Sequence, residues 1–295
     1  MKVLNYGSLN YDYVYEVDHI NKPGETQSCQ ARNVFCGGKG LNQSVALARA
    51  GVLVYQGGLI GEDGQLFLDI CQENGIDTSY LGRTEGPCGH AVIQLDKNGE
   101  NSIMIYGGAN QKQTPEHIAQ VLEKFGEGDI LLLQNEVNGL KDLIDQAWKR
   151  QMKIILNPSP WNDVLKECDL KKVSIFLINE VEGEQITGKQ KPEEILEEME
   201  RFYPDAQTVL TLGSQGAIWQ GEGRQIRQEA YPVKTVDTTA AGDTFTGYFI
   251  AGLTENIPME ENLNRAARAS AIAVSRMGAA PSIPLRREVE SWTKF

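Results

Sequence analysis

The stretch that decides the fold lies near the C-terminus: Asp237-Thr238-Thr239-Ala240-Ala241-Gly242-Asp243-Thr244-Phe245-Thr246-Gly247. Small residues between two carboxylates lead directly into an apolar helical pattern over residues 245–253. Small residues before a helix leave backbone N–H groups bare, with the positive end of the helix dipole behind them. The segment therefore predicts a binding site for phosphate oxygens. Small residues also suit a helix packed tightly against a strand, so the segment alone leaves both interpretations open.

The second carboxylate of this stretch adds a chemical function to the predicted anion site. Asp243 lies at the start of the helix, where it is placed to accept a proton from an attacking hydroxyl. An anion site beside a base is what phosphoryl transfer to an alcohol requires. The stretch therefore favours a kinase acting on a hydroxyl group.

Length and composition set the broad class of the protein. The chain has 295 residues, of which 41% are hydrophobic and 23% charged, as is typical of a soluble globular protein with a large core. Its net charge of −12 argues against nucleic acid or an anionic membrane as a partner. No apolar run approaches the roughly 18–20 residues of a spanning helix, and residues 1–7 lack the long apolar core of a signal peptide. We therefore expect a cytoplasmic protein.

Short apolar runs alternate with amphipathic helical patterns along most of the chain. Strand-like runs occur at 3–6, 53–55, 130–133, 153–156, 174–178 and 208–212. Helical patterns occur at 41–50, 140–149, 195–199 and 266–277. Nearly uniform apolar strands between amphipathic helices predict a parallel sheet covered on both faces.

Two segments break this alternation. Residues 11–35 and 90–106 lack helical periodicity and show the apolar–polar alternation of strands, and Asn98-Gly99 supplies a hairpin turn in the second segment. These segments predict a small sheet that projects from the main domain as a lid. An extension of the edge of the main sheet is the alternative.

A glycine-rich run, Cys36-Gly37-Gly38-Lys39-Gly40-Leu41-Asn42-Gln43-Ser44, precedes the first helical pattern. Glycines let the main chain approach a ligand closely, and Asn42 is placed to bond a hydroxyl. The run matches neither the Walker A nor the dinucleotide pattern, and a structural turn remains open. Asn10 and Asp12 follow the first strand, where open α/β sheets bind ligands, although an ordinary turn would also explain them.

Taken together, these segments resemble the PfkB carbohydrate kinase family, and within it the ribokinases. The run 37–42 is similar to the first family motif, and 237–243 is similar to the second, Asp-Thr-x-Gly-Ala-Gly-Asp. Two long motifs in the right order are far more specific than either alone. The resemblance covers the chain as a single domain, 1–295, and implies a three-layer α/β/α sandwich with a mostly parallel central sheet. It places the strands of a small β-sheet lid at about 11–36 and 88–107.

The resemblance implies a role for each matching position. Asp243 is similar to the catalytic base, and the N–H groups of Ala240, Ala241 and Gly242 would bind the γ-phosphate during transfer. Ala240 stands where the motif often has glycine, which need not block its N–H. The positions that match the sugar pocket are Asn10, Asp12, Gly38, Lys39, Asn42, Glu136 and Asp243. His90 would reach the sugar from the lid, or is simply a solvated edge residue.

The resemblance also implies ATP, Mg²⁺ and K⁺ as cofactors. Asn179 and Glu182 match a pattern that holds Mg²⁺-bound phosphate through water. The loop along ATP matches Thr211, Gly213, Ser214 and Gly216, with adenine between this loop and the helix at 266–277. A plain hairpin would explain these glycines equally well. The monovalent cation site matches Asp237, Thr239, Ala273, Arg276, Gly278 and Ser282, four of them through main-chain carbonyls.

The expected function is transfer of phosphate from ATP to the primary hydroxyl of a pentose, D-ribose above others. The alternatives are another sugar such as fructose or deoxyribose, a nucleoside, and a non-catalytic sugar or nucleotide sensor. Asn10 and Asp12 suit a polyol, Tyr11 and Tyr13 leave a nucleoside open, and an intact Asp243 counts against a sensor. An exposed lid edge would favour a homodimer.

Overall fold

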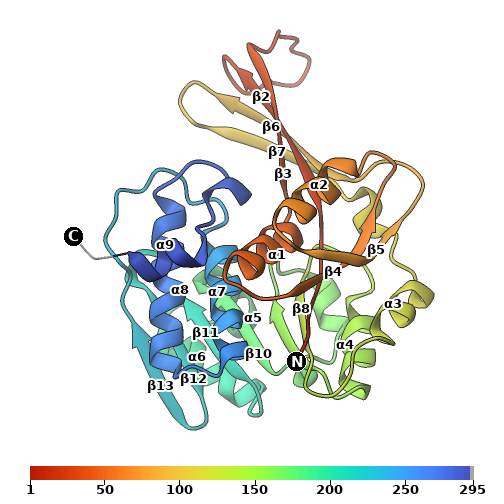
Figure 1. Cartoon of the computed structure of the whole chain (residues 1–295). Coiled ribbons are helices and arrows are strands. Elements are labelled where there is room, and N and C mark those ends of the chain that lie inside the picture. The colour runs from red at the N-terminus through yellow and green to blue at the C-terminus, as the bar shows by residue number, and fades with distance from the viewer. Residues whose placement is uncertain (293–295) are drawn as a thin grey trace.

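A nine-stranded sheet runs through the body of the protein, and a separate four-stranded sheet projects from it (Figure 1). The computed structural model describes residues 1–292. The large sheet has the strand order β13-β12-β11-β10-β9-β8-β1-β4-β5. Its strands are β1 (Val3–Tyr6), β4 (Val54–Ile60), β5 (Asp77–Arg83), β8 (Ile130–Gln134), β9 (Lys153–Asn157), β10 (Ile175–Asn179), β11 (Gln207–Thr211), β12 (Ala217–Gly221) and β13 (Arg224–Gln228).

Most neighbouring strands of the large sheet are parallel. Every pair from β5 across to β11 is parallel, whereas β12 and β13 continue the sheet as an antiparallel edge. The sequence interpretation assigned no strand range after residue 212, although the hairpin left open for the 213–216 glycines is present as β11 and β12. A tight turn at Gly213–Gln215 and Gly216, with φ of 95°, reverses the chain after β11 and starts the antiparallel pair.

Helices cover both faces of the sheet, giving three layers. They are α1 (Lys39–Arg49), α2 (Gln65–Glu73), α3 (Pro115–Leu122), α4 (Leu140–Lys149), α5 (Glu180–Thr187), α6 (Pro192–Phe202), α7 (Ala241–Glu255), α8 (Met259–Val274) and α9 (Arg286–Ser291). Figure 1 shows α1, α7 and α8 on one face and α5 and α6 behind the sheet. The expected architecture, a mostly parallel sheet between helical layers with a small separate sheet, is confirmed.

Two apolar cores follow from alternation along the buried strands. In β1, Val3 joins the core beneath α1, α7 and α8, whereas Leu4 and Tyr6 join the core beneath α3, α4 and α6. Ile130 and Leu131 of the neighbouring β8 divide in the same way. Because successive side chains point to opposite faces, a strand buried on both sides is mostly apolar, and a buried polar residue such as Asn5 of β1 needs hydrogen-bond partners.

Main-chain contacts fix the junction between β1 and α1, which lies under the site described below. A Cβ atom on Gly40, in the first turn of α1, would lie 2.4 Å from the Ser8 nitrogen and 2.5 Å from the Gly7 carbonyl carbon. A Cβ atom on Gly247 of α7 would lie 2.4 Å from the Cβ atom of Ala46. Glycine at these positions therefore lets β1, α1 and α7 meet closely enough to bring their polar groups together.

The small sheet has the order β3-β2-β6-β7, from β2 (Asn10–Val17), β3 (Ala31–Gly37), β6 (Gly89–Asp96) and β7 (Asn101–Tyr106). Strands β2 and β6 are parallel, and the two outer pairs are antiparallel. Strand β7 is exposed along its whole length, with Ile103 at 52% and Ile105 at 76% exposure. The sheet therefore presents apolar side chains to its surroundings.

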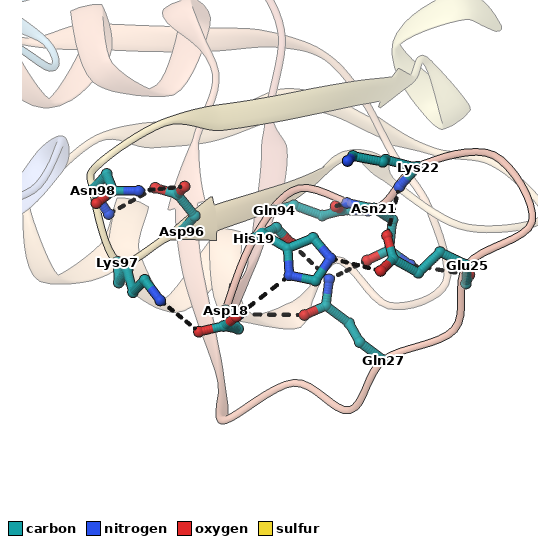
Figure 2. A network of polar contacts seen from close by, with 10 residues as sticks. All are labelled: Asp18, His19, Asn21, Lys22, Glu25, Gln27, Gln94, Asp96, Lys97 and Asn98. Atoms are coloured by element: carbon teal, nitrogen blue, oxygen red, sulfur yellow. Dashed lines mark hydrogen bonds and ion pairs between the residues drawn. The ribbon is translucent and has the colours of Figure 1, made fainter.

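The loop that joins β2 to β3 is held by polar side chains at the tip of the small sheet (Figure 2). The His19 ring lies between the carboxylates of Glu25, at 2.7 Å, and Asp18, at 3.4 Å. Lys97, from the β6–β7 turn, donates to Asp18 at 2.9 Å. The network is exposed, and the carboxylates raise the pKa of His19, first through the Glu25 hydrogen bond and then through Asp18.

The C-terminal helices differ in extent from the sequence expectation. The helix expected at 266–277 is α8, which starts earlier, at Met259, and ends at Val274. Gly278, with φ of 89°, lies in the turn that follows, and its N–H donates to Asp237 at 2.9 Å. In the described residues 1–292, no helix is long and apolar enough to cross a membrane.

Candidate active site

The predicted anion site lies at the start of α7. Ala240 precedes the helix in the left-handed region, with φ of 59° and ψ of 11°, and no side chain caps the helix. Amides in a first helical turn lack partners within the helix. The N–H of Ala241 donates to the Thr238 carbonyl at 3.2 Å, and a Cβ atom on Gly242 would meet nothing within 4 Å. The amide of Gly242 therefore borders open space at the positive end of the helix.

Asp243 is buried where α7 meets α1, with 7% exposure. Its Oδ2 accepts a hydrogen bond from Asn42 at 3.0 Å, and its Oδ1 accepts one from Gln43 at 2.9 Å. Two amide donors from one turn of α1 thus hold the carboxylate in place. Within residues 1–292, Asp243 has no ion-pair partner, and its two carboxylate oxygens are held by neutral amides.

Two adjoining cavities meet beside Asp243. The smaller, about 230 Å³, is lined by Lys39, Asn179, Glu182 and Asp243 among others. The larger, about 530 Å³, lies between the 213–216 loop and α8, and both cavities are lined by Thr211, Thr238, Ala241 and Gly242. Apolar residues of α8, including Ala267 and Ala271, line the larger cavity. An elongated ligand with an apolar ring and a charged end fits this pair of cavities.

Carboxylates and an ammonium group cluster at the smaller cavity. Burial favours a lower pKa for Lys39, but Asp243, Glu136 and Glu182 outweigh it and raise the pKa. Glu136 accepts a hydrogen bond from the Lys39 amide at 2.9 Å and another from the Ser8 hydroxyl. Burial raises the pKa of Glu136, while Lys39 and the hydrogen bonds oppose the shift. Lys39 therefore stays charged among three acidic groups.

The remaining predicted sugar residues lie where β2 leaves the body. Burial, with a smaller contribution from the Glu136 carboxylate, raises the pKa of Asp12 to about 6. Asn10 accepts a hydrogen bond through Oδ1 from Asn110 at 2.8 Å. Gly38, with φ of 90°, packs against the Asn10 and Ser8 backbone, where a Cβ atom would lie 3.0–3.1 Å from it. Among residues 1–292, the linings of the two cavities do not include Asn10 or Asp12.

His90 lies on the other side of the small sheet from Asn10 and Asp12. It pairs in register with Tyr11, whereas Asn10 and Asp12 pair with Gly89 and Ala91. Its ring centroid lies 5.5 Å from that of Tyr13 and 5.1 Å from that of Tyr106. Because side chains alternate along a strand, His90 faces away from Asn10 and Asp12, and this register does not favour the prediction that His90 reaches the sugar.

Asn179 and Glu182 form a capping box at the start of α5. The Glu182 amide donates to Asn179 Oδ1, and the Asn179 amide donates to Glu182 Oε2, both at 2.9 Å. The box holds both side chains at the smaller cavity and uses only one Glu182 carboxylate oxygen. The other oxygen suits a water ligand of Mg²⁺, which prefers hard oxygen donors and retains water.

Asp237, in the segment before α7, is hydrogen-bonded to the turn after α8. Its Oδ1 accepts bonds from the Thr239 amide and hydroxyl at 2.9 and 2.6 Å, and its Oδ2 accepts one from Gly278 at 2.9 Å. These bonds lower the pKa of Asp237, although burial opposes them. Ser282 is fully buried, and its hydroxyl donates a hydrogen bond to the Ala279 carbonyl. The Ala273 carbonyl accepts a hydrogen bond from the Arg276 amide. The donor set is all oxygen, as a monovalent cation requires.

Four polar residues of the site escaped the sequence interpretation. Gln43 was treated as part of a helical pattern, although it follows Asn42 directly and bonds Asp243. Asn110 bonds Asn10, Ser8 bonds Glu136, and Asn157 accepts from Gln43 at 3.3 Å. Gln43 lies in the glycine-rich run, Ser8 precedes Asn10 after the first strand, and Asn157 follows the strand expected at 153–156, whereas Asn110 lies in a segment with no recognisable pattern.

The arrangement defines a phosphotransferase that acts on a hydroxyl group. Comparison with known proteins agrees: the pfkB family carbohydrate kinase pattern matches residues 1–286. Ribokinase of Haemophilus influenzae is 35% identical over 96% of this chain and 95% of that protein. Deoxyribokinase of Salmonella typhi is 31% identical over 96% of each. The structure of Arabidopsis thaliana ribokinase complexed with ribose and ATP matches with a TM-score of 0.86 and 30% identity, over 98% of this chain and 97% of that one.

The chain therefore belongs to the pfkB family of carbohydrate kinases. It is an ATP-dependent sugar kinase.

Proposed function

We propose that the protein transfers the γ-phosphate of ATP to the primary hydroxyl of D-ribose, giving D-ribose 5-phosphate and ADP. The observation that carries the proposal is the position of Asp243, held by Asn42 and Gln43 where the two cavities meet. ATP fits the larger cavity with its phosphates toward the start of α7. The relatives named above act on ribose or deoxyribose, which supports a pentose as acceptor.

In this mechanism each group of the chain has a distinct role. Asp243 accepts the proton of the hydroxyl as the oxygen attacks phosphorus, and the ADP oxygen leaves with the bond electrons. The amides of Ala240, Ala241 and Gly242 bind the charge that develops on the phosphoryl oxygens. The bond from Ala241 to Thr238 must lengthen or be shared when phosphate binds. Lys39 adds a positive charge beside them.

The sugar would be bound between the body and the small sheet. Asp12 and Glu136 accept hydroxyl hydrogen bonds, and Asn10 donates because its Oδ1 is already occupied by Asn110. Gly38 and Asn42 complete the pocket. We take the small sheet, with strands within 11–36 and 88–107, to be a lid on the single domain, whose last three residues lie outside the described part. The lid would exclude water from the reaction.

Two cations belong to the proposal. Mg²⁺ would be held through water by Asn179 and Glu182 and would neutralise phosphate charge. K⁺ would be bound by Asp237, Ser282 and the carbonyls of Thr239, Ala273, Arg276 and Gly278. Since Asp237 connects the segment before α7 to the turn after α8, this ion would steady the anion site without touching substrate. Turnover in K⁺ compared with Li⁺ at equal ionic strength, for the wild type and Asp237→Asn, tests this role.

We also propose a cytoplasmic homodimer formed through the lid. Exposed side chains on the outer strands of the small sheet would be covered by a second copy: Val34, Phe35, Ile103, Met104, Ile105 and Tyr106. Light scattering should give twice the chain mass for the wild type and a monomer for Ile105→Lys. A monomeric wild type would overturn the dimer but not the reaction.

Release of ADP across a panel of acceptors tests the proposed reaction. Ribose should support the highest kcat/KM, with deoxyribose, fructose and nucleosides lower. Faster turnover with another acceptor would reassign the substrate, and no turnover with any would favour a sugar or nucleotide sensor. In Asp243→Asn, kcat should fall by roughly 10²–10⁴ with nearly unchanged ATP binding, the usual share of a general base.

A further inference from the structure

A continuous chain of buried amides and one hydroxyl ends at Asp243. Gln43 donates to Asp243 Oδ1 at 2.9 Å, and its Oε1 accepts from Gln134 at 2.7 Å. Gln134 also donates to Asn5 Oδ1 at 2.9 Å, and Asn5 donates to the Ser44 hydroxyl at 2.8 Å. These residues come from α1, β8 and β1, and each side chain is fully buried. The chain thus runs from the central strands to the carboxylate.

Main-chain carbonyls fix the direction of every bond in this chain. Asn5 Nδ2 donates to the Gly40 carbonyl at 2.7 Å, so its Oδ1 can only face the donor of Gln134. Gln134 Nε2 therefore meets Gln43 Oε1, which leaves Gln43 Nε2 to face Asp243. At the far end, Gln56 donates to the Gly57 carbonyl at 2.8 Å and accepts from Ser44 at 2.6 Å. A reversed amide anywhere would place two acceptors or two donors together.

We propose that Gln43 is a positioning residue for the base, and that Gln134 and Asn5 act through it. This inference rests on the proposed role of Asp243. Asn42 lies where the sugar is expected, so its bond to Asp243 is free to change when substrate binds. Gln43 is fully buried and its acceptor is engaged, so it keeps the carboxylate oriented throughout turnover. Its second N–H, directed to Asn157, adds a further restraint.

The space for this chain depends on glycine at the end of β1. A Cβ atom on Gly7 would lie 2.1 Å from Gln134 Oε1, so a larger residue would displace the Gln134 side chain. Gly7, which precedes the predicted sugar residue Asn10, therefore also leaves room for the hydrogen-bond chain that ends at Asp243.

Two substitutions at position 43 test the proposal with readouts that a packing role would not change. Gln43→Met removes the donor at similar volume, and kcat should fall about 10- to 100-fold with little change in KM for ATP, as expected for a misplaced reactive group. Gln43→Glu places a second carboxylate against Asp243. The pair would then share a proton, so the acid limb of the kcat profile should move to higher pH.

The role of Gln134 is tested by combination. Gln134→Met should lower kcat in the wild type and have no further effect in Gln43→Met or Asp243→Asn, because it acts through the same contact. Gln220→Met is the matched control: Gln220 is a buried glutamine of β12 that bonds the Leu196 carbonyl at 2.9 Å. Gln220→Met should lower the melting temperature as much as Gln43→Met and Gln134→Met do, but its kcat should stay at the wild-type value.

The outcomes separate this inference from the proposed function. If Asp243→Asn turns over near the wild-type rate, the assignment of the base fails and this inference fails with it. If Asp243→Asn is impaired while Gln43→Met keeps wild-type kcat, or Gln43→Glu keeps the wild-type pH profile, only the positioning role is overturned. Additive losses from Gln43→Met and Gln134→Met would overturn the action of Gln134 through Gln43.

Discussion

The buried amide chain that ends at Asp243 and the polar loop at the tip of the lid are built from the same kinds of hydrogen bond. The first is closed off from water, with Asn5, Gln43 and Gln134 fully buried. The second is exposed, and His19 is 44% exposed at its side chain (Figure 2). A buried polar group that loses its partner also loses access to water, whereas an exposed group simply turns to solvent. Burial, more than the number of bonds, therefore decides which network fixes a geometry.

The largest effect should follow from a methyl group beneath the buried network. Gly40→Ala would place a Cβ atom within 2.5 Å of the Gly7 and Ser8 backbone, which cannot move aside easily. We expect a loss of about 1–3 kcal/mol or more in the free energy of unfolding, measured by urea denaturation. Gly126→Ala is the control, since a Cβ atom there would meet nothing within 4 Å. Equal stability of both variants would contradict the close contact.

Asp12 lies between the two regions and should connect pH to sugar binding. Because its pKa is raised to about 6, the carboxylate becomes protonated as the pH falls through that value and loses its acceptor role. KM for the sugar should therefore rise below pH 6, by up to about tenfold per pH unit. Steady-state kinetics at constant ionic strength measure this, and Asp12→Asn should have a high KM without this pH dependence.

The same shift affects stability with a definite sign. A carboxyl group whose pKa is raised on folding contributes stability below its unfolded pKa, near 3.8, and loses it as pH rises through about 6. At pH 7 the unliganded Asp12→Asn variant should be more stable than the wild type by on the order of 1 kcal/mol. A less stable variant at pH 7 would contradict this sign.

A smaller effect on stability is expected from a substitution at Ala240, the residue before α7. Its φ of 59° costs a residue with a side chain about 1–2 kcal/mol, which glycine avoids. Glycine also loses more entropy on folding, so Ala240→Gly should gain at most about 1 kcal/mol in thermal denaturation. Asn256→Gly, at φ of 56°, should gain less because asparagine tolerates this conformation. A destabilised Ala240→Gly would show that the strain is absent.

The smallest effect should come from the exposed network of the lid. The pKa of His19 is raised by Glu25 and then by Asp18, so its stabilising contribution is present below the ordinary value of 6.5 and lost as pH rises through the raised pKa. The protection of the amides of loop 18–27 against exchange, relative to the intrinsic rate at each pH, should therefore fall over this rise in pH. His19→Gln should remove this pH dependence of protection while leaving the global melting temperature nearly unchanged. A large fall in the melting temperature of His19→Gln would show that the exposed network of the lid contributes to stability as a buried network does.

Patterns within short stretches of sequence predicted much of this molecule, whereas contacts between distant segments were not predicted. The anion site is visible because Gly242 and Asp243 share one short stretch, and the strand–helix alternation follows from periodicity. Strands β12 and β13 were not assigned, since the sequence of β13, Arg-Gln-Ile-Arg-Gln, has almost no apolar pattern and an edge strand is only partly buried. Gln43 was hidden because its partners, Gln134 and Asn5, come from distant strands. Their proximity depends on packing, which a single sequence does not display.

The close contact between Gly40 and the backbone of residues 7–8, after β1, limits how the protein could be engineered to phosphorylate other alcohols. The backbone of residues 7–8 packs against Gly40 and leaves no room for a side chain at position 40. A mutant library aimed at other alcohols should therefore randomise strands β2, β6 and β7 and leave the glycines unaltered. Diversity introduced at Gly7 or Gly40 would mostly yield insoluble clones.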